Sequence, residues 1–210
     1  MRDRNAPLTA ADIDALAWDK MDGLVPAIIQ DAATGQVLML GYMDRAALAA
    51  TLETGFATFF SRSKQRLWQK GETSGNRLAV GAVMMDCDAD ALLVKATPAG
   101  PTCHLGSESC FSESGPDGAG WLGKLARIVP ARAEADPAES YTARLLAEGL
   151  PRVAQKIGEE GVELALAATG RDTAGCVAET ADLLYHLTVL MEARGYGWDD
   201  VAALLAERHR

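Results

Sequence analysis

The sequence lacks a long apolar run. None of its 210 residues belongs to a continuous apolar stretch of the roughly 18 residues that a membrane-spanning helix needs. The N-terminal twenty residues hold no apolar segment of the kind found in secretory signal peptides, because charged side chains interrupt them throughout. We therefore expect a cytoplasmic protein with no membrane partner.

The chain also lacks an excess of basic residues. Its formal net charge is −9, and both the part before residue 120 and the part after it are acidic. This argues against a general nucleic-acid binder. One local exception is the segment 55–71, which has no acid but carries Arg62, Lys64, Arg66 and Lys70. These cations are enough for a few phosphate groups, although a solvated hairpin with basic tips has the same pattern.

Cysteine is scarce, and disulfides are rare in the cytoplasm. Cys87, Cys103 and Cys110 are too widely spaced for a zinc finger, whose cysteines pair two to four residues apart. Three protein ligands and one open position are typical of catalytic zinc, whereas inert buried thiols are the alternative. His104 adjoins Cys103 and is a candidate fourth ligand or proton shuttle.

The pattern of apolar residues changes along the chain. Before residue 111, short apolar runs predict strands near 24–30, 36–43, 56–61, 66–70, 77–85 and 91–98. Asp44 and Gly55 bound a predicted helix, and Thr9 with Asp12 predicts a helix cap. Residues 112–120, SESGPDGAG, have the composition of a linker. Beyond them the pattern predicts helices near 122–133, 141–148, 151–169, 174–194 and 199–208. The fold class is therefore an α+β domain followed by an all-helical domain.

The stretch DCDAD at residues 86–90 places three carboxylates within five positions. In a straight strand Asp86 and Asp90 would lie roughly 13 Å apart, so one cation would reach all three only if the backbone bends. A calcium loop of the EF-hand type is a poor match, because Ala91 and Thr97 stand where it needs glycine and glutamate. Magnesium suits the stretch better, and an acidic surface turn is the alternative.

A second set of carboxylates lies in the helical part. Glu160 and Glu163 are three residues apart, as are Glu179 and Asp182, and Glu159 lies one turn from Glu163. Like charges at this spacing destabilise a helix unless something compensates them. Two antiparallel helices could bring both pairs to one Mg²⁺ or Mn²⁺ ion, whereas a solvated acidic stripe needs no ion.

Two separate sets of motifs resemble known families. The stretches GYMDRAALAATLETG, SRSKQRLWQKGETSGN, DCDAD and GPTCHLGSESCF are similar to phosphoribosyl-AMP cyclohydrolase. SYTARLLAEGLPRVAQKIGEEGVELALAA and ETADLLYHLTVLM resemble phosphoribosyl-ATP pyrophosphatase, a relative of the MazG-type nucleotide pyrophosphohydrolases. Their fused order matches the bifunctional enzymes of histidine biosynthesis. The resemblance implies a cyclohydrolase domain at 1–111, a linker at 112–120 and a pyrophosphatase domain at 121–210.

The resemblance also implies the site residues. Zinc is expected on Cys87, Cys103 and Cys110, in a site built across a homodimer interface of a mainly β domain. Magnesium is expected on Asp86, Asp88 and Asp90, and a second magnesium on Glu160, Glu163, Glu179 and Asp182. The expected substrate-binding residues are Arg62, Lys64, Lys70, Glu72, Thr73, Ser74 and Gly75.

The implied chemistry is two successive hydrolyses. The helical domain would convert phosphoribosyl-ATP to phosphoribosyl-AMP and pyrophosphate, with Glu159 or Glu160 activating the water. The first domain would then open the adenine ring at N1–C6 with a zinc-activated water, and His104 would transfer the proton. Two alternatives remain open: a cyclohydrolase whose helical domain only dimerises or hydrolyses other nucleotides, and a zinc-stapled scaffold without activity.

Overall fold

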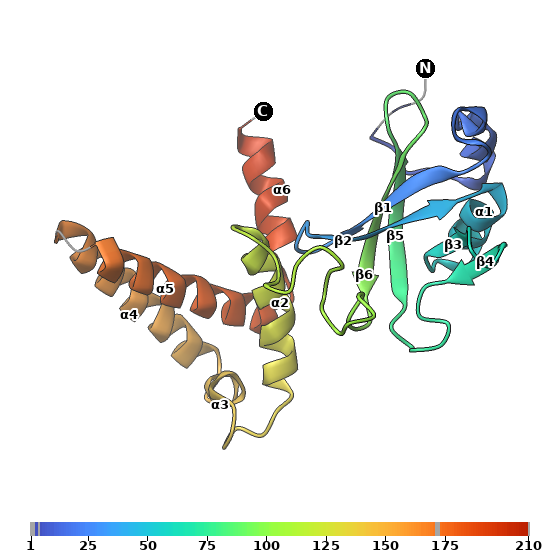
Figure 1. Ribbon diagram of the computed structural model, residues 1–210. Coiled ribbons are helices and arrows are strands. Elements are labelled where there is room, and N and C mark those ends of the chain that lie inside the picture. Colours follow the sequence, from blue (N-terminus) through green and yellow to red (C-terminus); the bar gives the residue numbers. More distant parts are fainter. Residues whose placement is uncertain (1–2, 4, 171–172, 210) are drawn as a thin grey trace. The chain divides into compact units, whose positions relative to one another are not determined.

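The computed structural model describes residues 3, 5–170 and 173–209. Its chain divides into two compact units, Met1–Gly120 and Trp121–Arg210 (Figure 1). Within the described residues, no helix combines the length and the apolar character needed to cross a bilayer. The first unit is a mixed β-sheet with short helices and the second is all helical, so the predicted fold class is confirmed.

The first unit is built on a four-stranded sheet in the order β2-β1-β6-β5. Its strands are β1 (Val25–Asp31), β2 (Val37–Met43), β5 (Leu78–Met85) and β6 (Leu92–Pro98). β1 pairs antiparallel with β2 and parallel with β6, and β6 pairs antiparallel with β5. Every second residue of β1 is buried, as expected when one face of a sheet covers a core. β2 and β5 therefore form opposite edges of the sheet.

A helix and a hairpin complete the first unit. α1 (Arg45–Thr54) begins at Asp44, whose carboxylate accepts a hydrogen bond from the backbone N–H of Ala47 at 2.7 Å. It ends at Gly55, which has the left-handed conformation that favours glycine. β3 (Thr58–Ser61) and β4 (Arg66–Gln69) form a separate antiparallel pair. The capped helix and all six strands predicted from the sequence are confirmed.

The N-terminal helix takes a tighter form than an α-helix. Residues Ala10–Ala15 and Trp18–Met21 are two 3₁₀ helices. Thr9 and Asp12 form the predicted capping box at the first of them. Trp18 follows and is buried, with its indole N–H donating to the carbonyl of Ile13.

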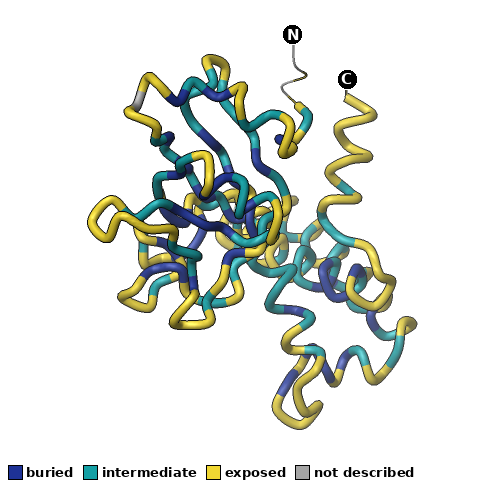
Figure 2. Tube along the Cα trace, turned by 90° about the vertical axis from the view of Figure 1, so that its right-hand side faces the viewer, coloured by how far each residue is buried: buried dark blue, intermediate teal, exposed yellow. Residues whose placement is uncertain are grey.

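The second unit contains five helices among its described residues: α2 (Gly120–Ala133), α3 (Tyr141–Ala147), α4 (Leu150–Thr169), α5 (Thr173–Arg194) and α6 (Trp198–Arg208). Each begins and ends within two residues of its predicted range. Its core is small and consists of Val129, Leu145, Val153 and Val189. α6 has no buried residue, and Figure 2 shows it exposed over most of its length. α4 and α5 form the helical hairpin on which the predicted carboxylates lie.

The cap of α1 gives a test of this fold. Replacing Asp44 with alanine should lower the free energy of unfolding by about 1 kcal/mol, because the N–H of Ala47 loses its acceptor. Urea unfolding followed by tryptophan fluorescence measures the change. Asp44→Asn keeps an acceptor and should stay closer to the wild type. Equal losses in the two variants would contradict the assigned cap.

Candidate metal centres and substrate pocket

The chain reverses direction between β5 and β6 within the DCDAD stretch. The Asp86 side chain accepts hydrogen bonds from the backbone N–H groups of Asp90 and Ala91, at 3.0 and 3.1 Å. Ala89 takes a left-handed conformation with a φ of 63°. This tight turn brings one carboxylate oxygen from each of Asp86, Asp88 and Asp90 within 4.8 Å of one another. The bend that a shared cation requires is therefore present.

A lysine distant in the sequence lies on this acidic turn. The ammonium of Lys20 lies 2.7 Å from a carboxylate oxygen of Asp88 and 3.0 Å from one of Asp90. It lowers the pKa of Asp88, and these two aspartates in turn raise the pKa of Lys20, with Asp88 contributing first. Lys20 was not predicted from the sequence, because no local pattern connects residues 68 positions apart.

Two of the three predicted thiols lie together after β6. The Cys103 sulfur accepts a hydrogen bond from the backbone N–H of Leu105 at 3.5 Å, and this contact, followed by Ser107 and Cys110, lowers the pKa of Cys103. The pKa of Cys110 is raised, mainly because its thiol is shielded from water and further by the neighbouring Cys103 thiol. His104 lies on the same loop, with Nδ1 4.0 Å from the Cys103 sulfur.

Cys87 lies elsewhere in the unit. It follows β5 at one edge of the sheet, whereas the backbone N–H of Cys110 bonds to the carbonyl of Leu38 in β2, at the opposite edge. Three strand spacings of ~4.8 Å separate these edges by about 14 Å. Two sulfurs bound to one zinc lie only about 4 Å apart, given Zn–S bonds of about 2.3 Å. One chain in this conformation therefore does not bring all three thiols to one ion.

The GETSGN loop at residues 71–76 is fixed by its own contacts. A side chain at Gly71 would come within 2.5 Å of the Asn76 carbonyl, so only glycine fits this close approach. Glu72 pairs with Arg66 of β4 at 2.6 Å, and this guanidinium lowers the pKa of the Glu72 carboxyl. Lys70 lies near enough to Cys110 to lower the pKa of that thiol. Lys70 immediately precedes the loop, so the loop begins within electrostatic range of Cys110.

The predicted substrate residues fall into two groups along the β3–β4 hairpin. Arg62 and Lys64 lie in its turn, and Lys70, Glu72, Thr73, Ser74 and Gly75 follow the far end of β4. Residues 73–75 are exposed in that loop. The Ser74 hydroxyl accepts a hydrogen bond from the backbone N–H of Asn76, and the N–H of Gly75 donates to the carbonyl of Gly71.

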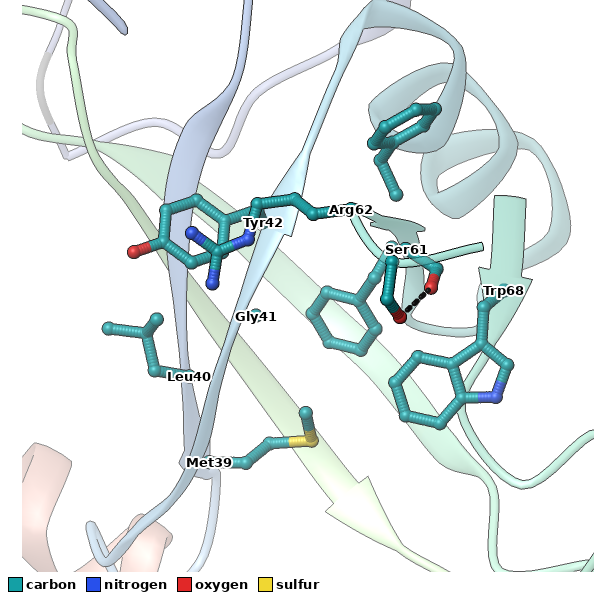
Figure 3. Close-up of a pocket in the computed structure, with 10 residues that line it drawn as sticks. Met39, Leu40, Gly41, Tyr42, Ser61, Arg62 and Trp68 are labelled. Carbon is teal, nitrogen blue, oxygen red and sulfur yellow. Dashed lines mark hydrogen bonds between the residues drawn. The ribbon is translucent and has the colours of Figure 1, made fainter. Parts of the chain in front are cut away.

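A pocket of about 520 Å³ opens between β2 and the hairpin (Figure 3). The Arg62 guanidinium stacks on the ring of Tyr42, 3.9 Å from its centroid. Within the described part of the chain, no carboxylate forms an ion pair with Arg62. The floor is tightly packed, because a side chain at Gly41 would lie 2.3 Å from the Phe59 ring. An unpaired guanidinium beside aromatic walls favours a ligand that has both an anionic group and a flat ring.

The helical hairpin brings three predicted carboxylates together in the second unit. Glu160 of α4 and both Glu179 and Asp182 of α5 each place an oxygen within 4.8 Å of the others. The pKa of Glu179 is raised. Burial is the largest cause, and the neighbouring carboxylates of Glu163, Asp182 and Glu160 add to it. Glu163 is exposed and outside the three-residue group, but close enough to act on Glu179.

Glu159 and Glu160 share one lysine. The ammonium of Lys156 lies 2.6 Å from Glu160 and 2.9 Å from Glu159, and these contacts raise its pKa, with Glu160 contributing first. Glu159 also accepts a hydrogen bond from Gln155 at 2.7 Å. Lys156 and then Gln155 lower the pKa of Glu159. Lys156 was not predicted from the sequence. Its spacing of three and four residues from the two glutamates could have indicated these ion pairs, because residues at that spacing are neighbours on a helix.

The donor atoms fit the metals that the sequence implies. Both acidic groups offer only carboxylate oxygens, which are the ligands that Mg²⁺ and Mn²⁺ prefer. The paired thiols offer two of the sulfur ligands that zinc prefers, and Cys103 has a lowered pKa, which favours the thiolate that zinc binds. Cys87 lies at the other edge of the sheet, so in this conformation it does not supply a third sulfur to the same pair within one chain.

Comparisons with known proteins cover both units. A family profile described as phosphoribosyl-AMP cyclohydrolase matches residues 39–112, and one described as phosphoribosyl-ATP pyrophosphohydrolase matches residues 122–209. The chain is 53% identical over 207 residues to the histidine biosynthesis bifunctional protein HisIE of Vibrio vulnificus strain YJ016, covering 96% of this chain and 98% of that protein. It is 55% identical over 198 residues to the HisIE of Xanthomonas campestris pv. campestris, covering 94% and 95%.

The ion pair between Arg66 and Glu72 predicts a pH-dependent stability. Because the folded pKa of Glu72 is lowered, the pair stabilises the fold above the unfolded pKa of about 4.3 and is lost as pH falls through the folded value. Glu72→Gln should therefore unfold at a lower temperature than the wild type at pH 7, and the two should converge once the pH has fallen below the folded pKa of Glu72.

Calorimetric thermal unfolding at several pH values tests this. About 1 M salt should shrink the difference at pH 7, because the pair is solvent accessible. Arg66→Gln should give the same pH profile as Glu72→Gln. A difference between Glu72→Gln and the wild type that persists at acid pH would mean that the ion pair is not its source.

Proposed function

The chain belongs to the family of bifunctional histidine biosynthesis proteins, with phosphoribosyl-AMP cyclohydrolase and phosphoribosyl-ATP pyrophosphohydrolase activities, and we propose how its two units divide the work. Residues 1–111 form the cyclohydrolase, 112–120 a linker and 121–210 the pyrophosphohydrolase. Residues 112–119 hold no helix or strand, and the two family matches lie on either side of 113–121. Both observations support this division.

The pyrophosphohydrolase reaction takes place at the carboxylates of α4 and α5. The convergence of Glu160, Glu179 and Asp182 is the observation that carries this assignment, with Glu163 on the same helix as a further ligand. A bound magnesium would offset the negative charge of the triphosphate. Water attacks the α-phosphorus, the bond to the β-phosphate breaks, and phosphoribosyl-AMP and pyrophosphate leave. Glu159 or Glu160 takes the proton from the water.

The cyclohydrolase reaction takes place beside the paired thiols. Zinc on Cys103, Cys110 and Cys87 would lower the pKa of water from about 15.7 toward roughly 7, which makes hydroxide available at neutral pH. The oxygen adds to C6 of the adenine, the N1–C6 bond breaks, and His104 moves a proton to or from the reacting atoms. The position of His104 next to Cys103 supports this role.

Substrate phosphates are held by the basic residues near the thiols. Lys70, whose charge acts on Cys110, and the following loop residues Glu72, Thr73, Ser74 and Gly75 bind one phosphate. Glu72 acts by keeping the loop in place through Arg66. Arg62, in the pocket lined by Tyr42, and Lys64 bind the second phosphate. Asp86, Asp88 and Asp90 would hold a magnesium ion, and this ion would replace the Lys20 ammonium as the partner of their carboxylates.

The cyclohydrolase site is completed by a homodimer. Cys87 of one chain joins Cys103 and Cys110 of another, because the two edges of a single sheet are too far apart. Apolar side chains on the β2 side support a second copy there: Leu40, Leu105 and Phe111 are 43%, 77% and 66% exposed. Burying such side chains against a partner is favourable.

The two activities should be separable by single substitutions. Cys103→Ser should lower the rate of ring opening by more than about 100-fold, because removing a residue that only supports a metal ligand already lowers activity about 10–100-fold. The rate of pyrophosphate release should stay unchanged. Glu179→Gln should do the reverse. Separate assays with phosphoribosyl-AMP and phosphoribosyl-ATP measure the two rates. Loss of both activities from either substitution, in a folded protein, would rule out independent sites.

Mixed dimers test the shared zinc site. Cys87→Ser and Cys103→Ser chains should each be inactive in ring opening, but dimers formed from an equal mixture should recover activity, because one of the two sites then has all three thiols. Random mixing would give half of the dimers one intact site, or about a quarter of the wild-type rate. Mixing Cys103→Ser with Cys110→Ser chains is the matched control and should restore nothing. Equal recovery in both mixtures, or none in either, would contradict the shared site.

A further inference from the structure

A buried histidine lies next to the carboxylate group of the second unit, and the proposed reaction gives it no role. His186 of α5 is only 5% exposed. Its Nδ1 atom lies 2.9 Å from the backbone carbonyl of Asp182 and 3.7 Å from a carboxylate oxygen of Glu160. Its Nε2 atom lies 3.2 Å from the hydroxyl of Tyr141. The imidazole therefore contacts two of the three clustered acidic residues from one side.

The contacts define which ring nitrogen donates. A carbonyl oxygen only accepts hydrogen bonds, so Nδ1 must carry a proton that points toward Asp182, with the Glu160 carboxylate beside it. In the neutral ring Nε2 then accepts the hydroxyl proton of Tyr141. Tyr141 thereby favours the tautomer in which Nδ1 faces the acidic residues.

Glu160 has few other partners to fix its direction. It is 5% exposed, and Lys156 holds the same oxygen, Oε1, that faces His186. Lys156 reaches Glu160 from the preceding turn of α4, whereas His186 approaches from α5. The carboxylate thus lies between a flexible lysine on its own helix, 2.6 Å away, and a rigid ring on the facing helix, 3.7 Å away.

We infer that His186, oriented by Tyr141, is a positioning residue that fixes Glu160 and the Asp182 turn in the arrangement a divalent ion needs. The inference rests on the proposed magnesium site. Groups that orient ligands in this way change metal affinity about 10–100-fold when they are removed. His186 does not touch the substrate in this role, so its effect is on the ion.

The same helix junction contains a matched control. Thr142 of α3 and Tyr185 of α5 share a hydrogen bond of 2.7 Å between their hydroxyls. This bond joins the same two helices as the Tyr141–His186 contact, at neighbouring positions. A general loss of α3–α5 packing would affect both contacts, but only the His186 contact faces the carboxylates.

Manganese binding to the full-length chain tests the inference without relying on activity. Calorimetry measures the dissociation constant for Mn²⁺ in the wild type. Binding at the carboxylate site is identified as the part of the signal that is absent from the Glu179→Gln variant. His186→Leu should raise this constant about 10–100-fold. His186→Asn, whose amide occupies the Nδ1 position, should bind Mn²⁺ more tightly than His186→Gln, whose amide occupies the Nε2 position. Tyr141→Phe should weaken binding by a smaller factor.

Stability and kinetics separate positioning from packing. Thr142→Val should lower the unfolding temperature and leave the Mn²⁺ constant within about threefold of the wild type. In pyrophosphohydrolase assays, Tyr141→Phe and His186→Asn should need more Mg²⁺ for half-maximal rate but approach the wild-type kcat when Mg²⁺ is saturating.

Each outcome has a definite meaning. If folded His186→Leu and Tyr141→Phe bind Mn²⁺ as the wild type does, His186 is a packing residue and the inference is wrong, while the metal site stands. The same conclusion follows if Thr142→Val weakens binding equally. If the Glu179→Gln variant binds as much Mn²⁺ as the wild type does, the proposed metal site is wrong and the inference is wrong with it.

Discussion

The repulsion between neighbouring carboxylates is the constraint on which both sites depend. Each unit places three acidic oxygens within 4.8 Å of one another, and each supplies a lysine to the group: Lys20 in the first unit and Lys156 in the second. Burying or clustering such charges is unfavourable without a compensating cation. An ammonium group balances part of the charge, and a divalent ion would balance more of it at a shorter range. The magnesium ions proposed above would therefore offset more of this repulsion than the lysines do.

Sheet topology imposes the second constraint. Because β2 and β5 are opposite edges, the thiols at residues 87 and 110 are separated by the full width of the sheet. The first unit therefore offers an acidic turn with one thiol at one edge, and a basic loop with two thiols at the other. The homodimer proposed above would join these complementary halves, with the exposed apolar side chains near β2 as its contact surface.

Local signals in the sequence predicted most of the fold. The cap at Asp44, the stop at Gly55 and the apolar runs located α1 and the six strands, because these features depend on neighbouring residues. The five helices of the second unit were predicted to within two residues for the same reason. The 3₁₀ form of the first helices was not predicted, because the cap at Thr9 and Asp12 marks where a helix begins but does not distinguish an α-helix from a 3₁₀ helix.

The sequence by itself determined the candidate residues for the chemistry. They are the thiols, the three aspartates, the basic segment and the helical carboxylates, all recognisable as residue types at fixed spacings. Only the tertiary structure decided which of them meet. It bent the DCDAD stretch into a turn, separated Cys87 from Cys103 and Cys110, and placed Lys20 and His186 against acidic groups. Spacing along a chain fixes neighbours only within one turn or one strand, whereas contacts between distant segments depend on how the whole unit buries its apolar surface.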